Sequence, residues 1–261
     1  MITQVENPVL EIHDLTVSYE RKPVLWDIDL SIPKGSLVGI IGPNGAGKST
    51  LIKAVMGLLP LSSGYVKLMD KNLEEVRDKI SYVPQRESVD WDFPISVFEV
   101  VLMGRYGKMG LMRRPSKKDK EIALQSLEQV GMSAFASRQI SQLSGGQQQR
   151  VFLARALAQE ADLYLMDEPF VGVDAATESA IITLLREMRE AGKTVIVVHH
   201  DLQSAAEYFD WVVLLNMRLV ASGETKTTLT TALLEETYGG RLTVLSEVGD
   251  LLKKAQFPSR E

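Results

Sequence analysis

Nine consecutive residues, Gly42 to Thr50, carry the strongest chemical signal in this sequence. They fit the phosphate-binding pattern G-x-x-x-x-G-K-S/T, in which glycines let the backbone wrap closely around a polyphosphate. The N-terminus of a following helix would add N–H donors and a partial positive charge. Lys48 could then reach the β- and γ-phosphates, and the Ser49 hydroxyl could bind Mg²⁺. The predicted binding residues are Gly42, Pro43, Asn44, Gly45, Ala46, Gly47, Lys48, Ser49 and Thr50.

The elements flanking this loop have the order that its chemistry needs. Residues 37–41 are apolar and are expected to form a buried strand, and residues 51–58 are expected to form a helix. An ordinary glycine-rich turn is the alternative interpretation. The strand–loop–helix context favours a binding loop for a nucleoside triphosphate.

A second pattern is an apolar run, residues 163–166, that ends in Asp167 and Glu168. An acid at the end of a central strand can hold Mg²⁺, as Asp167 would, and a neighbouring Glu168 can orient or deprotonate water. Because successive strand residues point to opposite faces, a turn must begin at Glu168 for both to serve one site. The alternative is that the two acids cap the following helix.

A third pattern, Ser144-Gly145-Gly146-Gln147, precedes a predicted helix at residues 147–158. Ser144 is a good N-cap, and the glycines permit close backbone approach. The motif therefore predicts either a capped helix start or a second phosphate-binding helix N-terminus.

Composition excludes several classes of protein. The chain has 261 residues, which suits one large α/β domain or two small ones, and a net charge of −5, which argues against a duplex nucleic-acid binder. It has no cysteine, so disulfides, thiolate zinc sites and cysteine nucleophiles are excluded. Without a long apolar run or a signal-like N-terminus, we expect a cytoplasmic protein.

Alternation of strands and helices predicts an α/β fold with a mostly parallel sheet. A helical stretch beginning near Arg86 interrupts this alternation. Further strands are expected at 9–19, 24–32, 65–69, 80–83, 194–198 and 211–215, and further helices at 116–130 and 176–190.

Taken in order, the three motifs resemble the nucleotide-binding subunit of an ABC (ATP-binding cassette) transporter, over roughly residues 9–225. The resemblance implies a P-loop NTPase with a RecA-like, mostly parallel sheet core, an N-terminal antiparallel β-subdomain and an inserted α-helical subdomain. It places the ABC ATPase domain at 1–240, the helical subdomain at about 86–158 and a C-terminal tail at 241–261.

The same resemblance assigns roles to four further residues. Tyr19 would stack on adenine, although a core aromatic is the alternative. Gln85 would sense Mg²⁺ and the γ-phosphate, Asp174 would lie in the loop that crosses to a partner subunit, and His200 would contact the γ-phosphate. A metal site made by His199, His200 and Asp201 is disfavoured, because adjacent strand residues face opposite ways.

The implied mechanism uses ATP and Mg²⁺. Glu168 would be the base, Lys48 and His200 would stabilise the γ-phosphate, and Ser49, Asp167 and Gln85 would be Mg²⁺ partners. ATP would lie between the phosphate loop of one copy and residues 144–147 of the other, in a head-to-tail homodimer.

The likeness also implies partners and a location. A separate integral membrane permease would dock near residues 89–94 and 101–107, and an extracytoplasmic metal-binding protein would act indirectly through that permease. No nucleic acid is expected. The chain would lie at the cytoplasmic face of the bacterial inner membrane.

Four stretches resemble the ATPases of bacterial manganese, zinc and chelated-iron importers, with manganese the nearest likeness. Three alternatives stay open: an exporter motor, a soluble ABC ATPase that does not transport, and a binding module without hydrolysis. The stretches are Asp90–Pro94, Leu102–Gly107, Arg113-Arg114-Pro115 and His199-His200.

Overall fold

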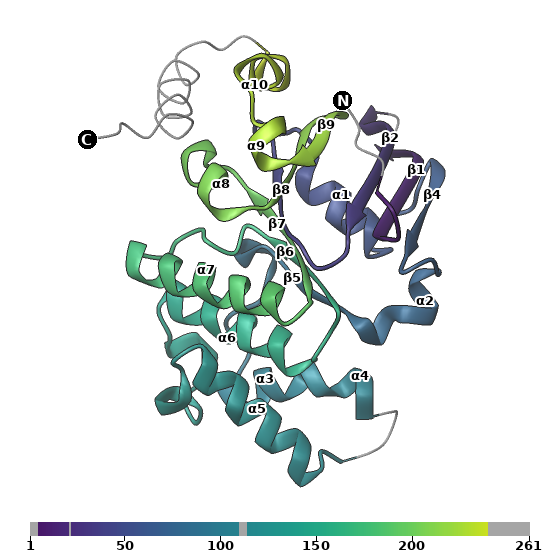
Figure 1. Cartoon of the computed structure of the whole chain (residues 1–261). Helices are drawn as coiled ribbons and strands as arrows, with labels where there is room; N and C mark the ends of the chain where they lie inside the picture. Colours follow the sequence, from purple (N-terminus) through teal and green to yellow (C-terminus); the bar gives the residue numbers. More distant parts are fainter. Residues whose placement is uncertain (1–4, 21, 110–113, 240–261) are drawn as a thin grey trace, which may run out of the picture. The chain divides into compact units, whose positions relative to one another are not determined.

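The computed structural model describes residues 5–20, 22–109 and 114–239. These form two compact units (Figure 1): one contains the described residues up to Leu73 and from Ile196 onward, and the other contains Glu74–Val195. Arg113 and the tail at 241–261, both named above, lie outside the described residues. None of the described helices is long and apolar enough to cross a membrane.

The first unit begins with a three-stranded antiparallel sheet in the order β2-β1-β4. Alternate residues of its strands, such as Ile12 and Ile28, are fully buried, as expected for a sheet with one face in a core. The predicted N-terminal antiparallel β-subdomain is therefore confirmed. Its strands are β1 (Pro8–Tyr19), β2 (Lys22–Pro33) and β4 (Ser63–Leu68).

The same unit contains β3 (Leu37–Ile41), which pairs in parallel with β8 (Trp211–Asn216). Every residue of β3 is buried, and Gly39 leaves room for Phe209, whose Cδ2 would lie 2.5 Å from an added Cβ. Strand β9 (Arg218–Glu224) extends this sheet antiparallel to β8. The helices of the unit are α1 (Lys48–Val55), α8 (Leu202–Tyr208), α9 (Thr225–Thr228) and α10 (Thr231–Tyr238).

The second unit pairs β5 (Ile80–Val83) in parallel with β6 (Leu163–Asp167). Figure 1 shows α3, α5 and α6 packed side by side in this unit, as the helical prediction required. Strand β7 (Thr194–His199) then leads the chain back to the first unit. The helices are α2 (Leu73–Val76, at the junction), α3 (Val97–Leu102), α4 (Tyr106–Met109), α5 (Lys117–Gln129), α6 (Gly145–Ala158) and α7 (Ala175–Glu190), with short 3₁₀ turns between them.

Capping chemistry explains where these helices start. Ser96, Ser116 and Ser144 each form a capping box, which satisfies two backbone donors at the start of α3, α5 and α6. As a result α6 begins at Gly145 rather than at residue 147. Helix α1, which has no side-chain cap, begins at Lys48 rather than at residue 51.

Candidate functional site

The phosphate-binding loop follows β3, and its backbone requires glycine. A Cβ at Gly42 would collide with the carbonyl oxygen of Leu215 in β8. Gly45 and Gly47 have φ of +81° and +93°, in the left-handed region that L side chains avoid. An added Cβ at Gly47 would also lie 2.5 Å from Leu25 Cδ2. The fold therefore requires glycine at these three positions, which leaves the backbone of the loop uncovered by side chains there.

The side chain of Lys48 folds back onto the start of the loop. Its side chain is buried, and Nζ donates to the carbonyl oxygens of Gly42 at 2.8 Å and Pro43 at 2.9 Å. Helix α1 starts at Lys48, and its N-cap, Gly47, has no side chain that could cap the first turn. A lysine ammonium beside an uncapped helix N-terminus suits a polyphosphate, so the residues fit the predicted ligand. Ser49 follows Lys48 in the first turn of α1, and its side chain is half-buried.

Main-chain hydrogen bonds connect the loop to the β8–β9 turn. Met217, at the β8–β9 turn, donates its N–H to Ala46 O at 2.9 Å and accepts the N–H of Trp26 at 2.8 Å. The loop itself is closed by Ala46 N donating to Pro43 O. These bonds restrict loop movement and prearrange the site.

Tyr19 ends β1, opposite Lys22 of β2, and its side chain is 47% exposed. A core aromatic would be buried, so this exposure favours the stacking role over the core alternative.

The turn from β7 to α8 presents His200 to solvent and buries His199. His199 Nε2 lies 2.7 Å from Ser204 Oγ, and Asp201 caps α8 by accepting from Gln203 N and Ser204 N. Burial, followed by the charge of His200, lowers the pKa of His199 to about 4 against an opposing effect of Asp201. His199 is therefore neutral near pH 7 and belongs to the packing beneath His200.

In the second unit, Asp167 is the last residue of β6 and Glu168 follows it. Asp167 is fully buried, and Glu168 has φ +54°, which begins a turn at the residue where the sequence required one. Gln85, after β5, donates its amide Nε2 to Glu168 Oε2 at 3.1 Å. Burial, and then the charge of Asp167, raises the pKa of Tyr82 to about 12. The parallel β5–β6 pair thus brings three predicted residues to one end.

The remaining predicted residues begin helices. Ser144 Oγ accepts from Gln147 N, and Gln147 Oε1 accepts from Ser144 N at 3.0 Å, so a capped helix start is present. Gly146 has space around it, with Val173 Cγ1 3.7 Å from an added Cβ. Asp174 caps α7 by accepting from Thr177 N at 2.8 Å, which lowers the pKa of Asp174.

The sequence did not single out Arg86 and Gln148. Arg86 directly follows Gln85, and its guanidinium donates twice to Gln148 Oε1, at 3.2 Å and 3.0 Å. Gln148 is buried in the first turns of α6. A buried amide needs a hydrogen-bond partner, but the burial of Gln148 is seen only in the structure, so the sequence carried no signal for this contact.

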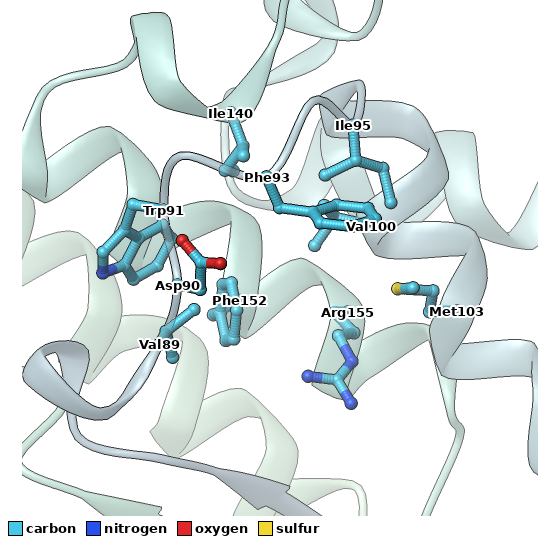
Figure 2. Close-up of a pocket in the computed structure, with 10 residues that line it drawn as sticks. All are labelled: Val89, Asp90, Trp91, Phe93, Ile95, Val100, Met103, Ile140, Phe152 and Arg155. Atoms are coloured by element: carbon cyan, nitrogen blue, oxygen red, sulfur yellow. The ribbon is translucent and has the colours of Figure 1, made fainter.

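An apolar pocket of about 200 Å³ lies in the second unit (Figure 2). It is bounded by the segment after Gln85, by α3 and by α6. Most of its lining is apolar, including Phe93, which is 56% exposed, and its two charged side chains are Asp90 and Arg155. Its lining residues are Val89, Asp90, Trp91, Phe93, Ile95, Val100, Met103, Ile140, Phe152 and Arg155.

The site residues thus divide between the units. Tyr19, the loop at 42–50 and His200 belong to the first, and the others belong to the second.

Comparison with known protein families identifies the chain. The model of the family described as ABC transporter matches residues 25–171. The chain belongs to the ABC transporter family. As a member it binds ATP and is an ATPase.

Two curated relatives of this ABC protein support the assignment. The manganese transport system ATP-binding protein of Bacillus subtilis is 61% identical over 91% of this chain and 95% of its own length. The zinc transport system ATP-binding protein of Treponema pallidum is 59% identical over 89% of this chain and 88% of its own length.

A solved ABC structure agrees in fold. A dimeric ATP-binding cassette in a post-hydrolysis state, bound to ADP and phosphate, is 29% identical, with a TM-score of 0.70 over 83% of this chain and 98% of that one. The predicted α/β P-loop NTPase fold is confirmed.

Proposed function

We propose that the chain is the ATP-hydrolysing motor of a bacterial ABC importer for a divalent metal ion, with manganese as the substrate. Zinc and chelated iron are the alternative cargoes. The observation that carries hydrolysis is the end of β6, where buried Asp167 adjoins Glu168 and Glu168 accepts from Gln85. The manganese assignment rests on the 61% identical relative.

The roles of individual residues follow from chemistry at this end of β6 and in the loop. Glu168 accepts the proton of the attacking water, while the Gln85 amide orients its carboxylate. Lys48 and His200 stabilise charge on the γ-phosphate. Mg²⁺ would be held by the Ser49 hydroxyl, Asp167 and Gln85, and when bound it neutralises charge on the phosphate oxygens.

Two copies of the chain act together in this proposal. Ser144–Gln147 and Asp174 begin helices of the second unit, where they can meet a phosphate chain held on the loop of another copy. The solved relative is dimeric, which supports a dimer, and we propose that the two copies of this chain pair head to tail. Each copy would comprise an ATPase domain at 1–240, with a helical subdomain at about 86–158, followed by a tail.

The apolar pocket is assigned to a permease. Relatives are named as ATP-binding proteins of transport systems, which implies a membrane component. The pocket would receive a short cytoplasmic helix of that permease, with an apolar residue against Phe93 and a carboxylate facing Arg155. The chain would therefore lie at the cytoplasmic face of the inner membrane. The extracytoplasmic metal-binding protein would contact the permease only.

Deleting the gene for this chain in its source organism tests the proposal. Cellular manganese, zinc and iron are measured by mass spectrometry, and manganese is expected to fall. The native gene should restore it, and a Glu168→Gln gene should not. A fall confined to zinc or iron would reassign the cargo, a rise in metal would indicate an exporter, and unchanged metal would contradict transport.

A further inference from the structure

We propose that Arg86 is a positioning residue that couples the pocket around Trp91 to the start of α6. The proposal rests on the function above, because the start of α6 matters for hydrolysis only if it meets the ATP of a partner copy. It adds a specific connection within the second unit, made of the side chains of Arg86, Gln148 and Trp91 and the carbonyl oxygen of Arg86.

The side chain of Arg86 controls one end of this connection. Its Nε and Nη2 both donate to Gln148 Oε1, and Gln148 Nε2 donates to Ile140 O at 3.2 Å. The guanidinium also lies against the first turn of α6, since a Cβ added at Gly145 would be 3.1 Å from Arg86 Cζ. Movement of this guanidinium must therefore disturb the first turn of α6.

The main chain of Arg86 is held at the other end. Trp91 Nε1 donates to Arg86 O at 2.8 Å, and the Trp91 ring lies 4.9 Å from the ring of Phe152. Arg86 Cζ lies 5.9 Å from the centroid of the Trp91 ring. Figure 2 shows Trp91 and Phe152 among the side chains that line the pocket. An occupant that displaces Trp91 therefore displaces Arg86.

Gln85, the residue before Arg86, connects this pair to the proposed base, Glu168. Gln85 donates to Glu168, so a shift of the Arg86 main chain also changes the orientation of the Glu168 carboxylate. Coupling between two sites is reciprocal. Closure of the start of α6 on ATP must consequently act back on Trp91, and this can be measured without the permease.

The first experiment separates positioning from packing. Gln148→Leu keeps the size of the side chain and removes both the acceptor for Arg86 and the donor to Ile140 O, whereas Gln148→Glu loses only the donor. Arg138→Lys is the matched control for Arg86→Lys, because Arg138 is exposed and lies over Phe135 at 4.8 Å. We expect Gln148→Leu and Arg86→Lys to lower kcat for ATP about tenfold. The Kd for ATP should stay within about twofold, and Arg138→Lys should resemble the native protein. Gln148→Glu should keep a higher kcat than Gln148→Leu, because it retains the acceptor for Arg86.

The second experiment reads the pocket directly. The chain has three tryptophans, and subtracting the emission of a Trp91→Phe variant isolates Trp91. In a Glu168→Gln background, addition of ATP and Mg²⁺ should shift this emission, and Gln148→Leu should at least halve the shift. Thermal melting confirms that each variant is folded.

The outcomes distinguish the two proposals. Native protein that neither binds nor hydrolyses ATP would refute the proposed function. Normal native hydrolysis, with a native kcat in Gln148→Leu and Arg86→Lys or with a Trp91 emission unaffected by ATP, would overturn the positioning role alone.

Discussion

Glu168 occupies a backbone conformation that its side chain does not favour. Its φ of +54° costs about 1–2 kcal/mol relative to the right-handed regions. The surroundings maintain it, because β6 is buried up to Asp167, Pro169 follows, and Gln85 binds the carboxylate. Residues in this conformation cluster at functional sites, which agrees with the role proposed for Glu168.

Replacing Glu168 with Gln tests its role at the scale of one residue. The amide keeps the size of the side chain but cannot accept a proton, so we expect ATP hydrolysis to fall about 10²–10⁴-fold. ATP binding should remain. Phosphate release and ATP affinity are measured side by side, with Glu187→Gln on the exposed face of α7 as the control. Turnover within about twofold of the native rate would remove Glu168 from the role of base.

Two glycines of the phosphate loop should respond differently to alanine. At Gly42 the new methyl group would meet the carbonyl oxygen of Leu215, and we expect a loss of about 3 kcal/mol or more. At Gly45 there is open space, so only the left-handed φ contributes, about 1–2 kcal/mol. Urea denaturation gives both free energies. A larger loss at Gly45 than at Gly42 would contradict the packing of the loop against β8.

At the scale of elements, the β7–α8 turn predicts a pH dependence of stability. The pKa of His199 is about 4 in the folded protein and near 6.5 in the unfolded chain. Between these values the unfolded chain binds a proton that the folded protein does not, so stability falls as the pH falls from 6.5 towards 4. The full effect is about 3 kcal/mol.

A His199→Asn variant isolates this contribution. Titrating groups that do not interact with His199 act equally in both proteins, so the difference in stability between the two proteins is the informative quantity. The free energy of unfolding of the native protein should decline more steeply below about pH 6.5 than that of the variant, as measured by urea denaturation at several pH values. A difference that stays constant with pH would show that His199 does not titrate in this way.

Local patterns predicted the strands and the loop well, because a buried strand and a glycine-rich turn are encoded by adjacent residues. The turn at Glu168 followed from strand geometry together with the assumption that both acids serve one site. Strand β9 was missed, since its hairpin turns at Met217 with φ +59°, where a glycine or asparagine would have been the signal. The bond from Arg86 to Gln148 joins residues 62 apart, and no local pattern reports such a contact.

At the scale of the whole molecule, the predicted chemistry is divided between two units of one chain. Lys48 and His200 lie in the first unit, and Gln85, Glu168 and the start of α6 lie in the second. In a head-to-tail pair each ATP would contact the loop of one copy and the start of α6 of the other. Neither copy alone would then contain a complete site.

Mixing two inactive variants tests this division. Lys48→Ala disables the loop. Gly146→Asp places a carboxylate where phosphate is expected. The helix should remain intact, because an acidic residue is favourable in the first turn and the position has space for a side chain. A mixed dimer would contain one site with both defects and one site with neither. We therefore expect ATP-dependent dimers and partial hydrolysis only in the mixture, detected by light scattering and phosphate release. Gly146→Asn, with a side chain of the same size and no charge, should be less impaired, and a mixture as inactive as its components would exclude sites shared between copies.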